Sequence, residues 1–408
     1  MHSKIYKMTL ATAIGLAITT TSPAAVYSYD KLHRLTRVTY DSGYNLRYNY
    51  DAAGNLLNMI ASHFSQVYRI IIGTNHNEVL IRSPEGLLEY QFPINGNSIA
   101  LAAIDSYADN TSEIVVARDN TVTLHELNGT EITTFPVTEQ NATLTVGDAN
   151  QDGKPDLALA SQVFPSMNAS VYTIEGDTLN PVPLFNANTL FNLAAGDVDN
   201  DGHDDIIAGS LEANEVSVNG VFTFTVFDSA SQTRHQPRKG SGKPNQENKE
   251  DKKVTVCHNP PGNQEAAHTI TISENALKAH LDHGDTLGYC PPPVYGVNVA
   301  VSDLDGDGQA EIIAAMANKG SRIEIYTGDG TFINGFEAFK NRHNGLVVTA
   351  GNVMGSPLPE IVVSEANGTE IRIFDKNGQQ IAHFQGAETS GIVSLAVGQE
   401  IVEIPVVQ

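Results

Sequence analysis

Short apolar stretches separated by acidic turns recur along most of this chain. The stretches LTVG, LAAG and VAVS precede three acidic loops, and LALA, IIAG and IIAA follow them. Alternation over such short stretches, bounded by Asp, Asn and Gly, indicates strands joined by turns. The pattern therefore predicts an all-β chain that is built from many short strands.

The acidic loops recur at a regular distance. Three of them follow the pattern D-x-[DN]-x-D-G-x-x-[DE] and begin at Asp148, Asp197 and Asp303, and weaker copies begin at Asp105 and Asn352. Successive loops start 43 or 49 residues apart, except for one spacing of 106 residues. A unit of about 45 residues with about four short strands has the size of one β-propeller blade. We therefore count five internal repeats.

The two ends of the array complement each other. The run from Tyr68 to Phe92 has the later strands of a unit, and residues 393–407 supply the strands that this run lacks. A blade that is assembled from both ends of the chain would close the ring. The sequence thus predicts a β-propeller of six blades closed by N- and C-terminal strands. Seven blades result if the long spacing conceals another degenerate unit.

The segments before the array have a different composition. Residues 1–25 combine two lysines, an apolar run and small residues, which is the layout of a secretory signal peptide. Residues 26–60 hold six of the 14 tyrosines and predict a strand-and-hairpin segment.

An insert explains the long spacing. Residues 229–253 are polar and basic, which predicts a flexible linker. Residues 254–292 predict a small α+β module with two strands and a helix that Ser273 caps and Gly284 ends. The insert divides the propeller into residues 61–228 and 293–408.

The charge of the chain excludes one class of partner. Lys and Arg number 24 against 47 Asp and Glu, so the formal net charge is −23. Nucleic-acid binding requires cationic surface that neutralises phosphates, so we exclude nucleic acid as a partner. No second apolar segment of about 20 residues is present, so we expect a secreted protein without a transmembrane segment.

The acidic loops have the chemistry of calcium sites. A hard cation takes several oxygen ligands at about 2.3–2.6 Å, and alternate residues of a tight loop can point toward one ion. The glycine after the fifth position allows a sharp turn. We expect about three Ca²⁺ ions, bound by Asp148, Asn150, Asp152 and Asp156, by Asp197, Asp199, Asp201 and Asp205, and by Asp303, Asp305, Asp307 and Glu311.

An EF-hand is the rival interpretation of these loops. It needs glutamate at position 12 and flanking helices. Position 12 is Leu159, Ala208 or Ala314, so an EF-hand is excluded.

The two degenerate loops are poorer candidates. One of them is a weaker calcium site with the ligands Asp105, Asp109 and Glu113. The Asn352 loop has lost most of its carboxylates, and we expect it to bind no ion.

The insert concentrates cysteine and histidine. Both cysteines of the chain, Cys257 and Cys290, enclose His258, His268, His280 and His283. Three interpretations are open: a disulfide alone, a disulfide beside a transition-metal site made by histidines, and a metal site with cysteine thiolates. Secretion favours the disulfide.

Three parts of the chain resemble known families. The loops at Asp148, Asp197 and Asp303 resemble the FG-GAP/VCBS repeats of integrin α-subunit propellers and of secreted bacterial proteins, over roughly residues 67–228 and 293–408. This resemblance implies a propeller with calcium in each intact loop and a role in binding or adhesion.

The tyrosine pattern resembles a second family. The segments that begin at Tyr27 and Tyr48 resemble the YD repeats of the RHS family of bacterial cell-surface proteins, although two copies cannot build that family's shell. The insert resembles a CHxPPGN…HGDxLGxC segment of secreted bacterial proteins, and this resemblance implies no function.

No motif for catalysis is present. The chain lacks G-x-S-x-G, H-E-x-x-H and P-loop patterns, so we expect no enzyme activity. We expect a secreted bacterial protein that binds a protein or glycan ligand on the cell surface or in the matrix. The alternatives are a structural subunit that self-assembles through strand addition by residues 26–60, and a polysaccharide-acting enzyme.

Overall fold

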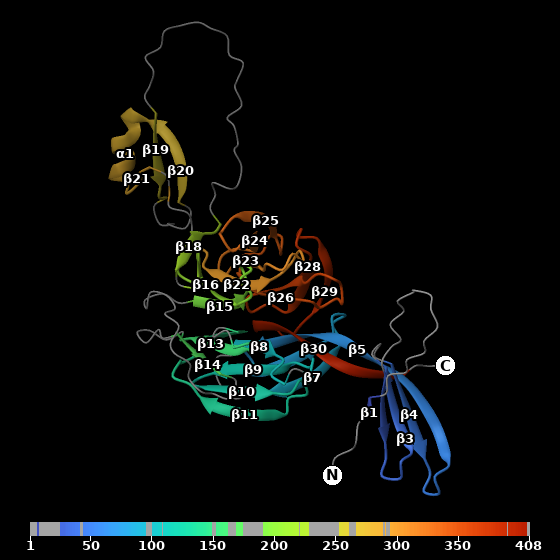
Figure 1. Cartoon of the computed structure of the whole chain (residues 1–408). Helices are drawn as coiled ribbons and strands as arrows, with labels where there is room; N and C mark the ends of the chain where they lie inside the picture. Colours follow the sequence, from blue (N-terminus) through green and yellow to red (C-terminus); the bar gives the residue numbers. More distant parts are fainter. Residues whose placement is uncertain are drawn as a thin grey trace, which may run out of the picture.

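The computed structural model describes most of the repeat array and the insert. The described residues are 6–7, 25–40, 44–94, 100–107, 109–148, 152–161, 169–173, 191–219, 221–227, 253–260, 267–288, 290, 294–389 and 391–405. Almost all regular structure in them is antiparallel β-sheet (Figure 1). No helix of this part of the chain is long and apolar enough to cross a membrane.

The repeats form a series of small sheets whose strands follow one another in chain order. In the first repeat-like sheet, β6 (Glu78–Arg82) lies between β5 (Leu56–Thr74) and β7 (Leu88–Pro93). The next two sheets contain β8 (Ala100–Ile104), β9 (Glu113–Arg118), β10 (Thr121–His125) and β11 (Glu131–Pro136), and then β12 (Thr143–Gly147), β13 (Asp156–Ala160) and β14 (Ala169–Tyr172).

Three further sheets continue the series. They contain β15 (Phe191–Gly196), β16 (Asp205–Ser210), β17 (Glu215–Val218) and β18 (Phe222–Thr225); β22 (Val297–Ser302), β23 (Glu311–Met316), β24 (Arg322–Tyr326) and β25 (Phe332–Glu337); and β26 (Leu346–Gly351), β27 (Glu360–Glu365), β28 (Glu370–Phe374) and β29 (Gln380–Gln385).

The sheets are arranged as a propeller that the two ends of the chain close. The C-terminal strand β30 (Ile392–Pro405) pairs with β5 and becomes the inner strand of the first sheet. In the described residues, the inner strands contact one another in the cycle β30, β8, β12, β15, β22, β26 and again β30. The predictions of an all-β propeller and of its closure by terminal strands are therefore confirmed.

The second strand of each blade is the most deeply buried. Every residue of β13, β16, β23 and β27 is buried. Neighbouring blades cover both faces of these strands, so their sequences are continuous apolar runs such as LALA and IIAA. Simple alternation is therefore a poorer description of these strands than of the outer ones.

The core lies between the blades. The joint between the last blade and the first contains Ile70, Ile72, Ile371, Ile373 and Ile392, which are fully buried. Burial of one such side chain stabilises the fold by about 1.5–3 kcal/mol, so the joint that closes the ring is a major source of its stability.

The tyrosine-rich segment forms an extension of the first blade. Strands β2 (Ala25–Tyr29), β3 (Leu35–Tyr40) and β4 (Tyr44–Tyr50) form a meander that pairs with the first half of β5, and β1 (Tyr6–Lys7) pairs with β2. Strands β5 and β30 leave the ring together and enter this sheet (Figure 1). The boundary expected between residues 60 and 61 thus lies inside one continuous strand.

The insert has its own small sheet. Strand β19 (Lys253–His258) lies between β20 (His268–Ser273) and β21 (Thr286–Leu287). A 3-10 turn (Glu274–Ala276) leads into helix α1 (Leu277–Asp282), and the Ser273 side chain accepts a hydrogen bond from the Asn275 N–H. The two strands, the helix and the cap have the predicted order.

Two sequence predictions lie outside the described residues. Of the expected signal peptide, residues 1–25, only residues 6, 7 and 25 are described. Of the expected linker, residues 229–253, only residue 253 is described.

Candidate functional site

The topology places the five acidic loops on one face of the ring. Each loop joins the first strand of a blade to the second, from β8 to β9, β12 to β13, β15 to β16, β22 to β23 and β26 to β27. Because the first strands run in the same direction through the ring, all five turns emerge at the same end. Loops that start as far apart in the sequence as Asp105 and Asn352 thus share one surface.

The loop between β15 and β16 folds around its first aspartate. The Asp197 carboxylate accepts hydrogen bonds from the backbone N–H groups of Asp201 (3.1 Å) and Gly202 (2.8 Å). Asp205 returns at the start of β16, and its carboxylate accepts from the N–H of Val198 at 3.1 Å. Backbone N–H groups of the turn therefore hold the carboxylates of both the first and the ninth position.

The loop between β22 and β23 repeats this arrangement. The Asp303 carboxylate accepts from the N–H groups of Asp307 (3.2 Å) and Gly308 (3.0 Å). Glu311 takes the place of Asp205, and it accepts from the Leu304 N–H at 2.8 Å.

The loop between β12 and β13 is described in part. The Asp148 carboxylate accepts from the N–H groups of Asp152 (3.0 Å) and Gly153 (2.8 Å), as in the other two loops. Asp156 is buried at the start of β13. Asn150 lies outside the described residues.

The structure brings together three of the four expected ligands in two loops. One ligand atom each of Asp197, Asp199 and Asp205 lie within 4.8 Å of one another, and the same holds for Asp303, Asp305 and Glu311. The fifth positions are not part of these groups. The carboxylates of Asp201 and Asp307 instead accept from the N–H groups of His203 and Gln309, and these bonds stabilise the turn.

The donor set fits a hard cation. All converging atoms are carboxylate oxygens, which are the ligands that Ca²⁺ prefers. Burial, and to a lesser extent the negative charges of the nearby Asp305, Asp303 and Asp307, raise the pKa of Glu311 to about 7. Burial also raises the pKa of Asp205. A bound cation would offset this mutual repulsion.

The two degenerate loops place a serine hydroxyl at the last carboxylate. Glu113 accepts from the Ser106 hydroxyl at 2.6 Å, and Glu360 accepts from the Ser356 hydroxyl at 2.5 Å. Asp105 still accepts from the Asp109 N–H at 3.0 Å. These hydroxyl groups satisfy carboxylates that have fewer acidic neighbours than those of the full loops.

Neighbouring loops are hydrogen-bonded to one another, which the sequence did not reveal. Asp204, next to the ninth position of one loop, accepts from the N–H of Asp148 in the preceding blade at 2.9 Å. The Ala310 N–H donates to the Asp197 carbonyl at 2.7 Å. The three full loops therefore form one connected row.

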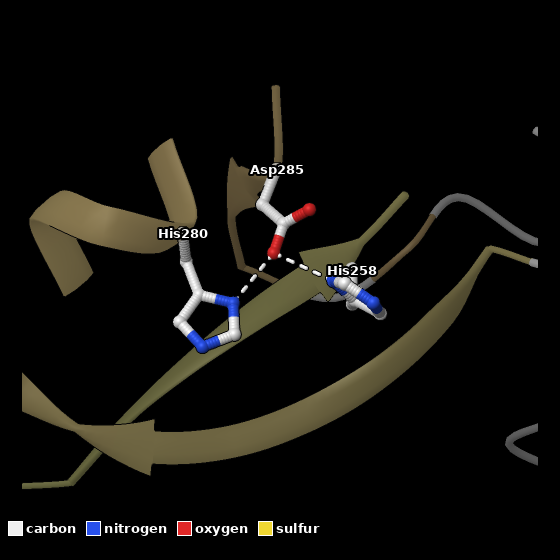
Figure 2. A group of neighbouring side chains, drawn as sticks. All are labelled: His258, His280 and Asp285. Carbon is white, nitrogen blue, oxygen red and sulfur yellow. Dashed lines mark hydrogen bonds and ion pairs between the residues drawn. The ribbon is translucent and has the colours of Figure 1, made fainter. Parts of the chain in front are cut away.

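The insert holds a third cluster. One ligand atom each of His258, His280 and Asp285 lie within 4.8 Å of one another (Figure 2). The Asp285 Oδ2 atom lies 2.9 Å from His258 Nδ1 and 2.7 Å from His280 Nδ1. Both histidines were predicted as ligands from the sequence, but Asp285 was not, because it follows the helix-ending Gly284 and belongs to no metal motif.

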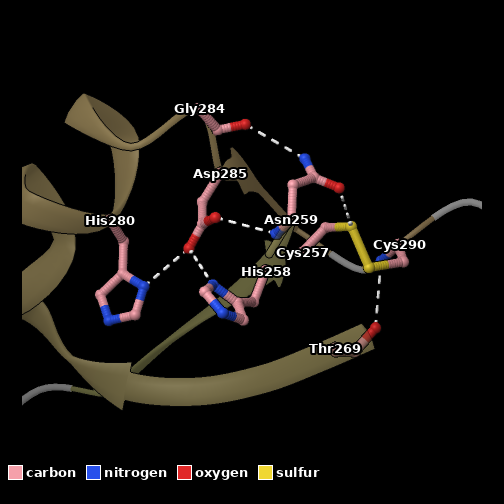
Figure 3. The surroundings of a disulfide bond; sticks show 8 residues. All are labelled: Cys257, His258, Asn259, Thr269, His280, Gly284, Asp285 and Cys290. Atoms are coloured by element: carbon pink, nitrogen blue, oxygen red, sulfur yellow. Dashed lines mark hydrogen bonds and ion pairs between the residues drawn. A yellow bond between two sulfur atoms is a disulfide. The ribbon is translucent and has the colours of Figure 1, made fainter. Parts of the chain in front are cut away.

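A disulfide joins the ends of the insert. Cys257 and Cys290 form an S–S bond of 2.00 Å (Figure 3). The interpretation that the thiolates bind a metal is therefore wrong for this structure, because both sulfur atoms are consumed in the bond. The other two expected histidines are not part of this group. Their ring centroids lie 5.3 Å (His268 to His258) and 6.4 Å (His283 to His280) from those of its members.

The surroundings of Asp285 stabilise its negative charge. Its side chain is fully buried. Burial by itself would raise the pKa, but the Asn259 N–H and the rings of His258 and His280 hold the pKa of Asp285 well below its usual range.

Two family models match parts of the chain. The FG-GAP-like repeat matches residues 148–208, which include two of the full acidic loops. The RHS repeat matches residues 29–61, in the tyrosine-rich sheet. These matches confirm the two resemblances over those residues, and the resemblance of the insert stays a prediction. A comparison with curated proteins gave no match.

Solved structures with a related chain path share little sequence. A protein of unknown function from Bacteroides caccae is 8% identical, with 81% of this chain and 99% of that chain covered and a TM-score of 0.45. A structure of a nidogen/laminin complex is 10% identical, with 81% and 98% covered and a TM-score of 0.43. A structure of BBS1N in complex with ARL6DN is 11% identical, with 83% and 87% covered and a TM-score of 0.39.

Proposed function

We propose that this protein is a secreted, six-bladed propeller that binds calcium in its acidic loops and a protein or glycan ligand on its surface. The observation that supports calcium most directly is the convergence of three carboxylates in each of two loops, at the position where the repeat pattern expects ligands. The ions are structural in this proposal. Each links the two ends of a turn between the inner and the second strand of a blade.

The connected row of loops supports a binding role for this face. Hydrogen bonds between blades fix the loops relative to one another, so a partner would meet a rigid surface. Rigid surfaces lose less conformational entropy on binding than mobile loops do. The disulfide of the insert supports an extracellular location, since such bonds persist in oxidising compartments.

Elemental analysis and thermal unfolding test the calcium proposal. We expect about three Ca²⁺ per purified chain, and a lower melting temperature after removal of the ion by a chelator. A site that is saturated at a hundredfold excess over its Kd stabilises the folded state by about 2.7 kcal/mol. A chain that retains no calcium and melts at the same temperature in chelator would contradict the proposal.

A panel of immobilised glycans and matrix proteins tests the binding role. We expect saturable binding to at least one class, with weaker binding in chelator. Turnover of a polysaccharide by the same preparation would instead support the enzyme alternative.

Self-association through the tyrosine-rich sheet is a second candidate function. In the described residues, the pairing of β30 with β5 ends at Ser62, so residues 56–61 of β5 pair with β4 alone. This open edge carries Leu57 and Met59, whose side chains are 65% and 51% exposed. Open edges with apolar side chains can add a strand from another chain.

Sedimentation over a range of concentrations tests this candidate. We expect a concentration-dependent increase in mass that the double substitution Leu57→Lys and Met59→Lys abolishes. The matched control is Val221→Lys, at an exposed valine in the turn between β17 and β18. A monomer at all concentrations, or loss of association in the control, would exclude assembly through this edge.

A further inference from the structure

Three different elements of the insert position the side chains of the histidine cluster. His258 lies at the end of β19, next to Cys257 and its disulfide (Figure 3). His280 lies on α1, and Asp285 follows the turn at Gly284, whose φ is +95°. The three side chains thus come from a strand, a helix and a tight turn.

Backbone contacts hold the carboxylate in place. The Asp285 N–H donates to the His280 carbonyl at 3.1 Å, and the Asp285 Oδ1 atom accepts from the Asn259 N–H at 2.9 Å. Only the Oδ2 atom therefore faces the two imidazoles, and both present their Nδ1 atoms to it (Figure 2). A metal-binding group requires this kind of fixed donor arrangement.

We propose that His258, His280 and Asp285 form a binding site for a divalent transition metal ion, with Zn²⁺ as the ion of choice. The two Nδ1 atoms and the Oδ2 atom are the ligands. Ligand atoms around a tetrahedral Zn²⁺ lie about 3.3 Å apart, given bonds of about 2.0–2.1 Å. The observed Nδ1–Oδ2 distances of 2.9 and 2.7 Å need to open by only about half an ångström.

Metal binding requires each imidazole proton to move from one ring nitrogen to the other. In the hydrogen-bonded state, each neutral ring carries its proton on Nδ1 and donates it to Asp285. When the metal binds, each proton moves to Nε2, and the Nδ1 lone pair binds the ion. The side chains of His258 and His280 are 26% and 23% exposed, so ion and water can reach the site.

The donor types distinguish this site from the acidic loops. Two imidazole nitrogens and one carboxylate suit zinc and its neighbours in the transition series, whereas Ca²⁺ prefers oxygen ligands alone. Three protein ligands leave one position of a tetrahedral ion for water or for a group of a partner. The inference is independent of the calcium proposal, because no residue is shared.

The ligand set differs from the four histidines that the sequence suggested. His268 and His283 are not part of the group whose ligand atoms converge in the described residues. They pack edge-on against His258 and His280 instead. We assign them no metal bond.

A zinc titration of the full, metal-free chain in excess Ca²⁺ tests the proposal. Excess calcium occupies the acidic loops, so heat or competition signals from Zn²⁺ report the insert. We expect one equivalent in the wild type, and at least tenfold weaker binding in His280→Gln and Asp285→Asn. His283→Gln is the matched control, one turn along the same helix segment, and it should bind as the wild type does.

A measurement on the wild type keeps the test valid if a variant misfolds. Long-range ¹H–¹⁵N spectra of the imidazoles should show that Zn²⁺ moves the proton of His258 and His280 from Nδ1 to Nε2. The absence of a saturable one-equivalent site in the wild type would overturn the proposal. Equal weakening by His283→Gln, or no change in the His258 and His280 spectra, would do the same.

Discussion

Glycine and phenylalanine form a repeated contact between adjacent blades. The contact pairs are Gly86 with Phe384, Gly129 with Phe92, Gly330 with Phe224, and Gly378 with Phe336. Each glycine lies in the turn before an outer strand with φ between +79° and +91°. A Cβ atom there would lie only 2.5–2.8 Å from the ring of the preceding blade. Glycine is therefore required here for two reasons: it adopts the left-handed turn, and it leaves space for the phenyl ring of the neighbouring blade.

Replacement of one such glycine should destabilise the ring. Gly330→Ala should lower the free energy of unfolding by about 1–2 kcal/mol because of the left-handed backbone. The clash with Phe224 should lower it by a further ~1–3 kcal/mol. Gly54→Ala is the matched control, since Gly54 has φ +92° but only Arg34 at 3.5 Å. Denaturant unfolding should show the larger loss for Gly330→Ala. Equal losses of unfolding free energy in the two variants would mean that the contact between Gly330 and the Phe224 side chain does not contribute to stability.

The acidic loops fold through their own backbone bonds. In four loops, the carboxylate of the first aspartate accepts hydrogen bonds from the backbone N–H groups that lie four and five residues later in the chain. These aspartates are Asp105, Asp148, Asp197 and Asp303. The degenerate loop at Asp105 keeps these bonds although it has fewer carboxylates. An ion is therefore expected to stabilise a turn that is already formed, rather than to fold it.

A substitution of Asp305 measures how much a bound ion stabilises the loop. Its carboxylate converges with Asp303 and Glu311, and it forms an ion pair of 3.6 Å with the exposed Lys376. Asp305→Asn should reduce the bound calcium by one ion and lower the melting temperature by a few degrees in calcium, with little change in chelator. Asp329→Asn, at an acidic turn outside the loops, is the control. A loss of stability that is equal in chelator would show a structural role without an ion.

One pair of long strands determines whether the ring is complete. Residues 392–402 of β30 pair with residues 65–74 of β5 within the ring, and Glu403–Pro405 pair with residues 62–64 in the outer sheet. Glu403 also binds Arg47 at 3.0 Å and the Ser62 hydroxyl at 2.5 Å. The same two strands thus close the propeller and attach the tyrosine-rich sheet.

Truncation separates the two roles. A chain that ends at Gly391 loses Leu395 and Ala396 from the core and exposes the inner side of β5, so we expect loss of the cooperative thermal transition. A chain that ends at Val402 keeps the ring pairing and should melt close to the full chain. Calorimetry compares the three chains. A cooperative transition in the shorter chain would show that β30 is dispensable for closure.

Local patterns were enough to predict the architecture. The spacing of the loops at Asp148, Asp197 and Asp303 indicated blades, because each blade is a local meander whose turns recur at a fixed distance in the chain. Ser273 and Gly284 indicated the ends of the helical segment for the same reason, since caps act on neighbouring backbone groups.

Contacts between distant segments required the tertiary structure. Asp285 gave no signal in the sequence, and it joins the histidines only because Gly284 turns the chain back toward β19. The bond from Asp204 to the Asp148 N–H and the stacking of Phe224 on Gly330 depend on which blades are neighbours. The strands, the repeats and most of the candidate ligands could be predicted from local patterns, because these depend on nearby residues. The register of the closing strands, the bonds between blades and the side-chain clusters depend instead on packing between segments that lie far apart along the chain.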